Sequence, residues 1–236
     1  MPEYSPILSL ATAAFELGAA AWVWRAPGRR EVQRLVAALL VLLAGYQLIE
    51  VAVCGSDNAP IWARLAFADV VWLPPLGWLL VWRLSRRRPL WRRAGQVALV
   101  LAGGLTVWVM LDPLFVTGSV CKAVIAIYTN PTNALEAYGA FYHIGLWGMI
   151  FGGLRVALTA RDERDRQHAG DVVTGTVAFV VLALTTEIVF PGAKGATPSI
   201  MCHYAIALAV CFVRLARREA RATASEAAAG PVITAV

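Results

Sequence analysis

The sequence predicts an all-α membrane protein built as a bundle of seven transmembrane helices. Hydrophobic residues make up 59% of the 236 residues and charged residues only 15%, whereas soluble domains carry about 25% charged residues. The apolar residues form long runs, and clusters of arginine follow every second run. This alternation is typical of repeated membrane spans joined by short loops.

Seven segments are long and apolar enough to cross the hydrocarbon core of a bilayer, which is about 30 Å thick. They cover approximately residues 6–25, 33–54, 61–82, 94–111, 135–156, 171–190 and 199–216. The third segment contains the pair Pro74-Pro75. Because proline lacks a backbone donor and clashes with the preceding turn, we expect a kink near this pair.

The basic residues predict the orientation of the bundle. All but three of the 21 lysine and arginine residues close or follow the first, third, fifth and seventh segments, the exceptions being Arg64, Lys122 and Lys194. Since cytoplasmic loops carry an excess of basic residues, we expect the N-terminus outside and the C-terminus in the cytoplasm. The net charge of +6 comes from these clusters. Their placement fits membrane topology better than phosphate binding, so no nucleic-acid partner is expected.

The domain organisation follows from the same pattern. One membrane domain is expected over residues 1–221, followed by a disordered cytoplasmic tail over residues 222–236, which is rich in Ala, Ser and Gly. The longest outer loop runs from Asp112 to Asn133 and is too apolar for a solvated linker. We expect it to fold over the bundle as a lid, with a short helix as one possible element.

Ionisable side chains within the spans gather toward the outer side. Such residues are expensive in a bilayer and usually serve a purpose. Those in the outer halves are Glu50, Asp69, His143, Glu187 and His203. Glu16, near the middle of the first segment, lies at a different depth.

Helical spacing places several polar residues on shared faces. Gln47, Glu50 and Cys54 are spaced i, i+3 and i+7, and Ser199 shares most of one face with Cys202 and His203. If these faces turn inward, they line one outward-opening cavity. The predicted ligand-binding set is Gln47, Glu50, Asp69, Trp72, Tyr142, His143, Glu187, Ser199 and His203. The alternative is that single members only form hydrogen bonds between helices, or lie at headgroup level facing water.

Three of the four cysteines also lie toward the outer side. Disulfides persist in oxidising compartments, and we favour the pair Cys54–Cys121, with Cys54–Cys202 as the next choice. A disulfide to Cys121 would pin the lid to the bundle. The remaining thiol is also a candidate soft metal ligand, and the candidates are His143, His203, Cys202 and Glu50. A metal site needs three or four converging ligands, and the sequence identifies no cofactor.

Several chemistries are excluded by missing residues. The last span has no lysine for a retinal Schiff base, and the chain has no H-E-x-x-H, G-x-S-x-G, P-loop or C-x-x-C motif. The H-x-x-x-H pattern of ceramidase-like zinc hydrolases is also missing, because Ala207 stands one turn beyond His203.

Three short stretches carry a resemblance to known proteins. They are Tyr46-Gln47-Leu48-Ile49-Glu50, the region from Arg64-Leu65 to Pro74-Pro75-Leu76, and Pro198-Ser199-Ile200-Met201-Cys202. Together they resemble uncharacterised small bacterial seven-helix membrane proteins. The second stretch is also similar to the seven-helix sensor region of bacterial histidine kinases. The resemblance implies a multi-pass protein of the bacterial inner membrane and a sensing role that would require a protein partner.

The leading hypothesis is therefore a protein that binds or senses a small polar or cationic ligand from outside. Glu50, Asp69 and Glu187 would supply charge, His143 and His203 could respond to pH, and motion about Pro74-Pro75 could relay occupancy inward. The alternatives are a metal-dependent hydrolase or transferase acting on lipid, a transporter coupled to protons or ions, and a structural subunit of a larger membrane complex.

Overall fold

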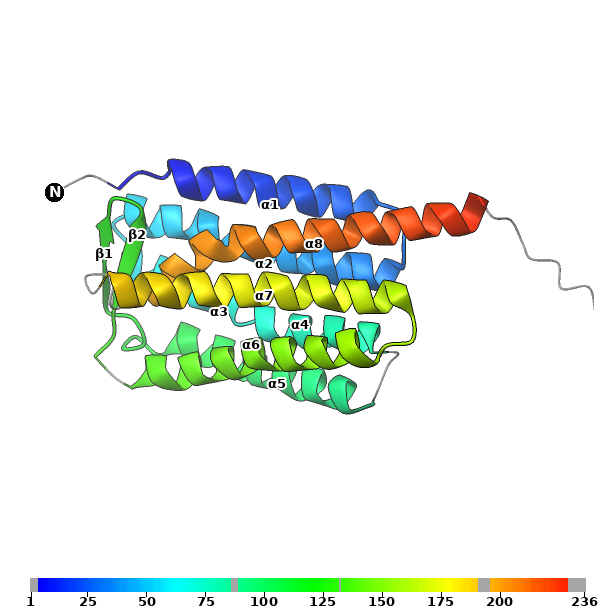
Figure 1. Cartoon of the computed structure of the whole chain (residues 1–236). Helices are drawn as coiled ribbons and strands as arrows, with labels where there is room; N and C mark the ends of the chain where they lie inside the picture. The colour runs from blue at the N-terminus through cyan, green and yellow to red at the C-terminus, as the bar shows by residue number, and fades with distance from the viewer. Residues whose placement is uncertain (1–3, 86–88, 132, 191–195, 229–236) are drawn as a thin grey trace, which may run out of the picture.

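The computed structural model describes residues 4–85, 89–131, 133–190 and 196–228. Within them, seven long apolar helical segments pack side by side in one bundle, as the sequence predicts (Figure 1). The helices are α1 (Ile7–Arg25), α2 (Arg30–Gly55), α3 (Ala59–Val70), α4 (Leu73–Leu84), α5 (Pro89–Leu111), α6 (Ala134–Thr159), α7 (Glu163–Val189) and α8 (Thr197–Ala228). Helices α3 and α4 together form the third span.

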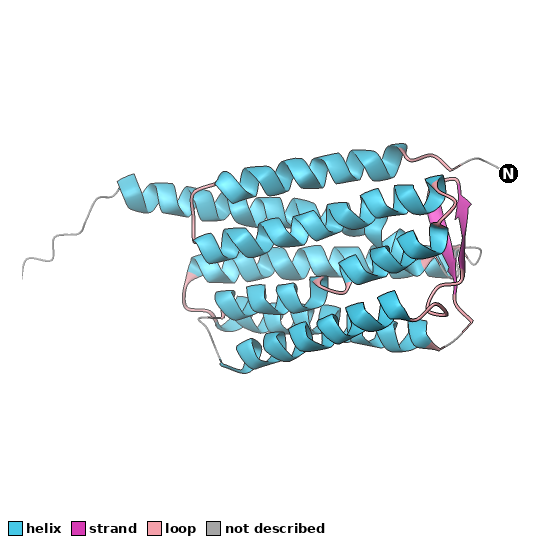
Figure 2. Ribbon diagram, turned by 180° about the vertical axis from the view of Figure 1, so that it is seen from behind, coloured by secondary structure: helices cyan, strands magenta, loops and turns pink. Residues whose placement is uncertain are grey.

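The two ends of the bundle differ in character. One end, here called the hairpin end, carries the start of α1 and a two-stranded sheet of β1 (Gly118–Lys122) and β2 (Ile125–Thr129), seen clearly in Figure 2. The opposite end, here called the arginine-rich end, carries the last turn of α1 and the extended C-terminal part of α8. The spans alternate in direction between these two ends.

The third span breaks just before its two prolines. Helix α3 ends at Val70, and Pro74 and Pro75 stand in the first turn of α4. In that turn the missing backbone N–H costs nothing, because the first N–H groups of a helix have no intrahelical partner. On the neighbouring helix α6, Gly145 lies against Pro74, and a Cβ at Gly145 would be 2.2 Å from the proline Cβ. The break and the glycine together let α4 and α6 approach closely.

The outer surface of the bundle is apolar. Large side chains such as Val100, Leu158 and Ile188 are 75% to 79% exposed. In water such a surface would be strongly unfavourable, but against lipid tails it is the expected surface of membrane helices. The composition and the exposed side chains are therefore consistent with contact with a lipid bilayer.

Two segments differ from expectation. The lid contains a β-hairpin rather than a helix, with Val120 paired opposite Ile127. Helix α8 continues through Ala228, so residues 222–228 are helical where a disordered tail is expected. Residues 229–236 lie outside the described part of the chain.

Candidate functional site beneath the hairpin

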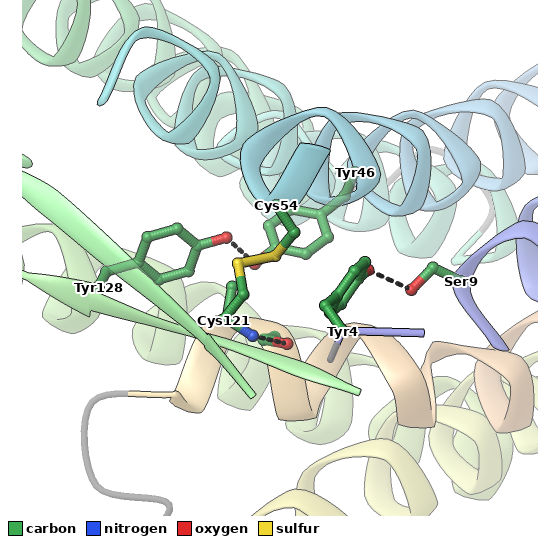
Figure 3. The surroundings of a disulfide bond; sticks show 8 residues. Tyr4, Ser9, Tyr46, Cys54, Cys121 and Tyr128 are labelled. Carbon is green, nitrogen blue, oxygen red and sulfur yellow. Dashed lines mark hydrogen bonds between the residues drawn. A yellow bond between two sulfur atoms is a disulfide. The ribbon is translucent and has the colours of Figure 1, made fainter. Parts of the chain in front are cut away.

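A disulfide anchors the hairpin to the bundle. Cys54, at the end of α2, is bonded to Cys121 of β1, with the two Cα atoms 5.8 Å apart (Figure 3). The favoured pairing is thus confirmed. Cys202 and Cys211 are free, and Cys202 is buried. The bond fixes one strand of the lid at the end of α2, four residues beyond Glu50 and seven beyond Gln47.

Hydrogen bonds hold the lid to three other elements. The backbone N–H of Ala126 in β2 donates to the Ser199 hydroxyl of α8 at 3.1 Å. The hydroxyls of Tyr46 and Tyr128 are 3.0 Å apart and link α2 to β2. The N-terminal segment joins the hairpin through a bond from Ser5 N–H to the Ala123 carbonyl. The lid is therefore tied to α2, to α8 and to the segment that precedes α1.

Beneath the lid, the carboxyl group of Glu50 is completely buried. Its side chain is 0% exposed and lies close to the hydroxyls of Tyr4, Ser9 and Ser199 and to the imidazole of His203. Neither carboxylate oxygen has a hydrogen bond of regular geometry, although Tyr4 and Ser9 bond to each other at 3.2 Å (Figure 3). No lysine or arginine in the described ranges forms an ion pair with Glu50.

Two further acceptors near Glu50 lack donors. Gln47 donates its amide N–H to the Cys202 carbonyl, which leaves its own buried oxygen unpaired. The Nδ1 of His203 lies 2.7 Å from the Ser199 carbonyl oxygen, so Nδ1 carries a proton, and in the neutral imidazole the buried Nε2 is an unpaired acceptor. The buried site thus offers four unpaired acceptor atoms, and the hydroxyl donors near Glu50 carry no charge.

Glu16 extends this polar region toward the middle of the membrane. Ser9, Thr12 and Glu16 are all buried and lie on one face of α1. Both carboxylate oxygens of Glu16 are buried without a hydrogen bond. The Cys202 thiol lies within electrostatic range of both Glu16 and Glu50. Sequence analysis set Glu16 apart because of its depth, but the i, i+3 and i+7 spacing on α1 could have indicated the shared face.

A separate cavity of about 180 Å³ lies beside this group. Tyr142 and His143 of the predicted set line it, together with Cys202. The remaining lining is mostly apolar and comes from Phe67, Val70, Leu135, Tyr138, Gly139, Thr197, Pro198 and Met201. His143 donates from Nδ1 to the Gly139 carbonyl, which leaves its Nε2 free to accept. The cavity therefore combines an apolar wall with one imidazole and one thiol.

The other predicted residues are dispersed. Asp69 packs against Gly45 of α2, and one carboxylate oxygen would be 2.9 Å from a Cβ at that glycine. Trp72 lines a lipid-facing groove with apolar residues of α1 and α2. No contact within the described residues joins Glu187 to Glu50. The predicted single cavity is thus divided: Gln47, Glu50, Ser199 and His203 form one buried group, and Tyr142 with His143 borders another.

The metal candidates do not form a metal centre. In the part of the chain that the structure describes, no group of three or more His, Cys, Asp and Glu side chains could hold a metal ion. His143 lines the cavity, whereas Glu50 and His203 lie in the buried group beneath the lid.

Sequence analysis missed a second polar cluster at the arginine-rich end. Glu219 of α8 is 0% exposed and accepts hydrogen bonds from Arg29, which precedes α2, and from Arg164 of α7. Arg29 also pairs with Asp165 at 2.6 Å and donates to Nδ1 of His168. These five residues are here called the Glu219 cluster. Its arginines were assigned only a topological role, and the single acid within the basic run Arg217–Arg221 is the sequence signal that could have indicated pairing.

The charge of Arg29 is secured by its surroundings. Burial lowers the pKa of the guanidinium group, but hydrogen bonds and charge interactions with Glu219 and Asp165 outweigh that effect and hold the pKa above its usual value. Arg29 therefore stays charged and joins the α1–α2 turn to α7 and α8.

No protein-family model, curated protein or solved structure matches this chain.

Proposed function

We propose that this protein is a membrane receptor that binds a small cationic ligand at Glu50, from the outer side of a bacterial inner membrane. The observation that carries the proposal is the complete burial of the Glu50 carboxyl group without a lysine or arginine partner among the described residues. A small cation such as an alkali-metal ion or a primary ammonium ion would interact with the four unpaired acceptors described above.

The electrostatics of burial support a cationic ligand. An ionised carboxylate in a low-dielectric interior is unfavourable unless it is paired, and within membrane spans such groups pair, face water or bind ions. The hydroxyls of Tyr4, Ser9 and Ser199 could donate hydrogen bonds, but they carry no charge to neutralise Glu50. An ionised Glu50 therefore needs a positive charge beside it. A bound cation would supply that charge, and a proton would replace the cation when the site is empty.

The lid indicates the side from which the ligand enters. The excess of arginine at the opposite end favours a cytoplasmic position for that end, so the hairpin end would face outward. A disulfide between Cys54 and Cys121 fits an oxidising compartment outside the cytoplasm. Because the lid covers Glu50, binding would require the lid or the N-terminal segment to move.

The packing below Glu16 favours reception over transport. Between Glu16 and the arginine-rich end, the interior is filled by fully buried apolar residues. They include Val23 of α1, Leu40 of α2 and Phe212 of α8. A transported ion would have to cross this apolar layer, whereas a receptor needs access from one side only. Passing a signal onward would then require a membrane or cytoplasmic protein partner.

Thermal unfolding of the purified protein in neutral detergent tests the proposal. Chloride salts of Na⁺, K⁺, ammonium, methylammonium and the bulky N-methylglucamine would be compared at constant pH and ionic strength. A cation present at 100 times its Kd stabilises the folded state by about 2.7 kcal/mol. For a chain of this size, that corresponds to a rise in Tm of roughly 5–10 °C.

Two glutamine variants separate the site from general salt effects. Glu50→Gln removes the charge at the buried site and should abolish the cation-specific rise in Tm. Glu136→Gln changes an exposed glutamate at the same end of the bundle and should leave the rise intact. The proposal fails if none of the small cations differs from N-methylglucamine, or if Glu50→Gln responds as the unmodified protein does.

A further inference from the structure

A groove runs along the surface between α1 and α8, away from the lid. Its volume is about 540 Å³. Its lining changes in character along its length, from apolar side chains to arginines. The lining residues are Phe15, Val210, Val213, Arg214, Arg217, Arg218 and Arg221. The groove is therefore amphipathic, with its charged part at the arginine-rich end.

The length of the groove matches one leaflet of a bilayer. Val210 and Arg221 are eleven residues apart on α8, which corresponds to about 16 Å at 1.5 Å per residue. Half of a hydrocarbon core about 30 Å thick is about 15 Å. On the facing helix, Phe15 lies ten residues before Arg25, the last residue of α1. The apolar part of the groove thus reaches the middle of the membrane, and the arginines stand at headgroup level.

The arginines of the groove are only partly neutralised. Arg214 and Arg218 both pair with the buried Asp171 of α7, at 3.2 and 3.3 Å. Arg217 lies over the Trp22 ring of α1, 5.9 Å from its centroid. Arg217 and Arg221 form no ion pair with any residue that the structure describes, and both are exposed. The side chains of Arg217 and Arg221 are therefore available to bind an anion at the charged end of the groove.

We infer that this groove binds one anionic phospholipid from the leaflet at the arginine-rich end. An acyl chain lies along Phe15, Val210 and Val213, and the phosphate lies between Arg217 and Arg221. The occupant is a lipid because the apolar part of the groove continues to mid-membrane depth, which a free anion would not use. The lipid is anionic because the groove has a net positive charge even after pairing with Asp171. This site does not depend on the proposed function of Glu50.

Native mass spectrometry and thermal unfolding test the site with defined lipids. Delipidated protein in neutral detergent would be titrated with dioleoyl phosphatidylglycerol, with dioleoyl phosphatidylcholine and with inorganic phosphate. We expect only the anionic lipid to be retained and to raise the Tm. The double variant Arg217→Gln/Arg221→Gln should bind it about 30-fold more weakly, since each arginine near an anionic surface contributes roughly a fivefold factor.

Two further variants test the two parts of the groove. Arg30→Gln/Arg93→Gln removes the same charge from exposed positions at this end and outside the groove, and should bind the lipid as well as the unmodified chain does. Val210→Trp fills the apolar part at an exposed, lipid-facing position and should weaken binding although all arginines remain.

Three results would overturn the inference. The first is equal retention of phosphatidylcholine and phosphatidylglycerol. The second is an equal loss of binding in the Arg30/Arg93 control. The third is stabilisation by inorganic phosphate as strong as that by the lipid, which would indicate a simple anion site.

Discussion

Replacing Glu219 with alanine removes the central acceptor of the Glu219 cluster. Its carboxylate receives the backbone N–H of Arg29 at 2.6 Å and side-chain N–H groups of Arg29 and Arg164 at 3.1 and 2.8 Å. These contacts join the α1–α2 turn to α7 and α8. After the replacement, two guanidinium groups that are only 35% and 16% exposed lose their shared acid. We therefore expect the variant to be less stable.

The expected loss is about 3 kcal/mol. Removing one partner of a buried ion pair typically costs about 3–5 kcal/mol, because the other charge is left buried and unpaired. The lower end of that range applies here, since Arg29 keeps Asp165 and Arg164 keeps Glu226. A loss of this size changes the ratio of folded to unfolded protein by more than 100-fold.

Glu226 provides a matched control on the same helix. It also pairs with Arg164, at 2.9 Å, but it is 68% exposed. Exposed ion pairs contribute at most about 1 kcal/mol. Glu226→Ala should therefore cost less than 1 kcal/mol, and Glu219→Gln, which keeps an acceptor oxygen without the charge, should fall between the two alanine variants.

Unfolding by sodium dodecyl sulfate in mixed micelles, followed by helical circular dichroism, measures these differences. Equal losses for Glu219→Ala and Glu226→Ala would refute the reasoning, because burial would then not determine the strength of the pairing. A loss below 1 kcal/mol for Glu219→Ala would refute it as well.

Three further changes can be followed by the same unfolding assay. Replacing Cys54 and Cys121 with serine should cost up to about 4 kcal/mol, since the disulfide closes a loop with a sequence separation of 67; a reducing agent should lower the stability of the unmodified protein equally. Gly28→Ala should cost at least 1 kcal/mol, because Gly28 has φ of +149° and a Cβ there would be 2.6 Å from the Glu219 side chain. Gly145→Ala should destabilise the contact with the first proline of α4, and Gly104→Ala, with open space around it, should not.

Hydropathy and local chemistry account for what could be predicted. The seven spans follow from runs of apolar residues, because backbone groups in lipid must be satisfied within a helix. The break before Pro74 follows from the missing N–H of proline. A disulfide among Cys54, Cys121 and Cys202 could be predicted because all three cysteines lie toward the same side of the membrane. Each of these inferences needs only the depth or the local sequence of a residue.

What could not be predicted depends on tertiary contacts. The side chains of Asp69 and Glu50 both lie on the hairpin side of their spans, but the direction each one takes around its helix decides whether they meet. Residues 222–228 include good helix formers such as Ala and Glu, and Arg164 of α7 also bonds to Thr223 and pairs with Glu226 in this extension of α8. In the lid, β-branched residues such as Val120 and Ile127 favour strands, but pairing becomes stable only where the hairpin packs on the bundle.

The positions of the Glu50 group and the Glu219 cluster suggest how ligand binding at Glu50 would be transmitted to the arginine-rich end. Helix α8 carries His203 beside Glu50 and Glu219 in the second cluster, sixteen residues or about 24 Å away. Helices α1 and α2 contribute to both clusters as well, through Ser9 and Glu50 at the hairpin end and through the Arg29 turn at the other. The proline break, in contrast, places Trp72 in a lipid-facing groove rather than beside Glu50. A shift of α8 against α1 and α2 would therefore connect the two clusters directly, because residues of all three segments take part in both. Both clusters contact that one continuous helix, and coupling between them would require a ligand at Glu50 to change its position.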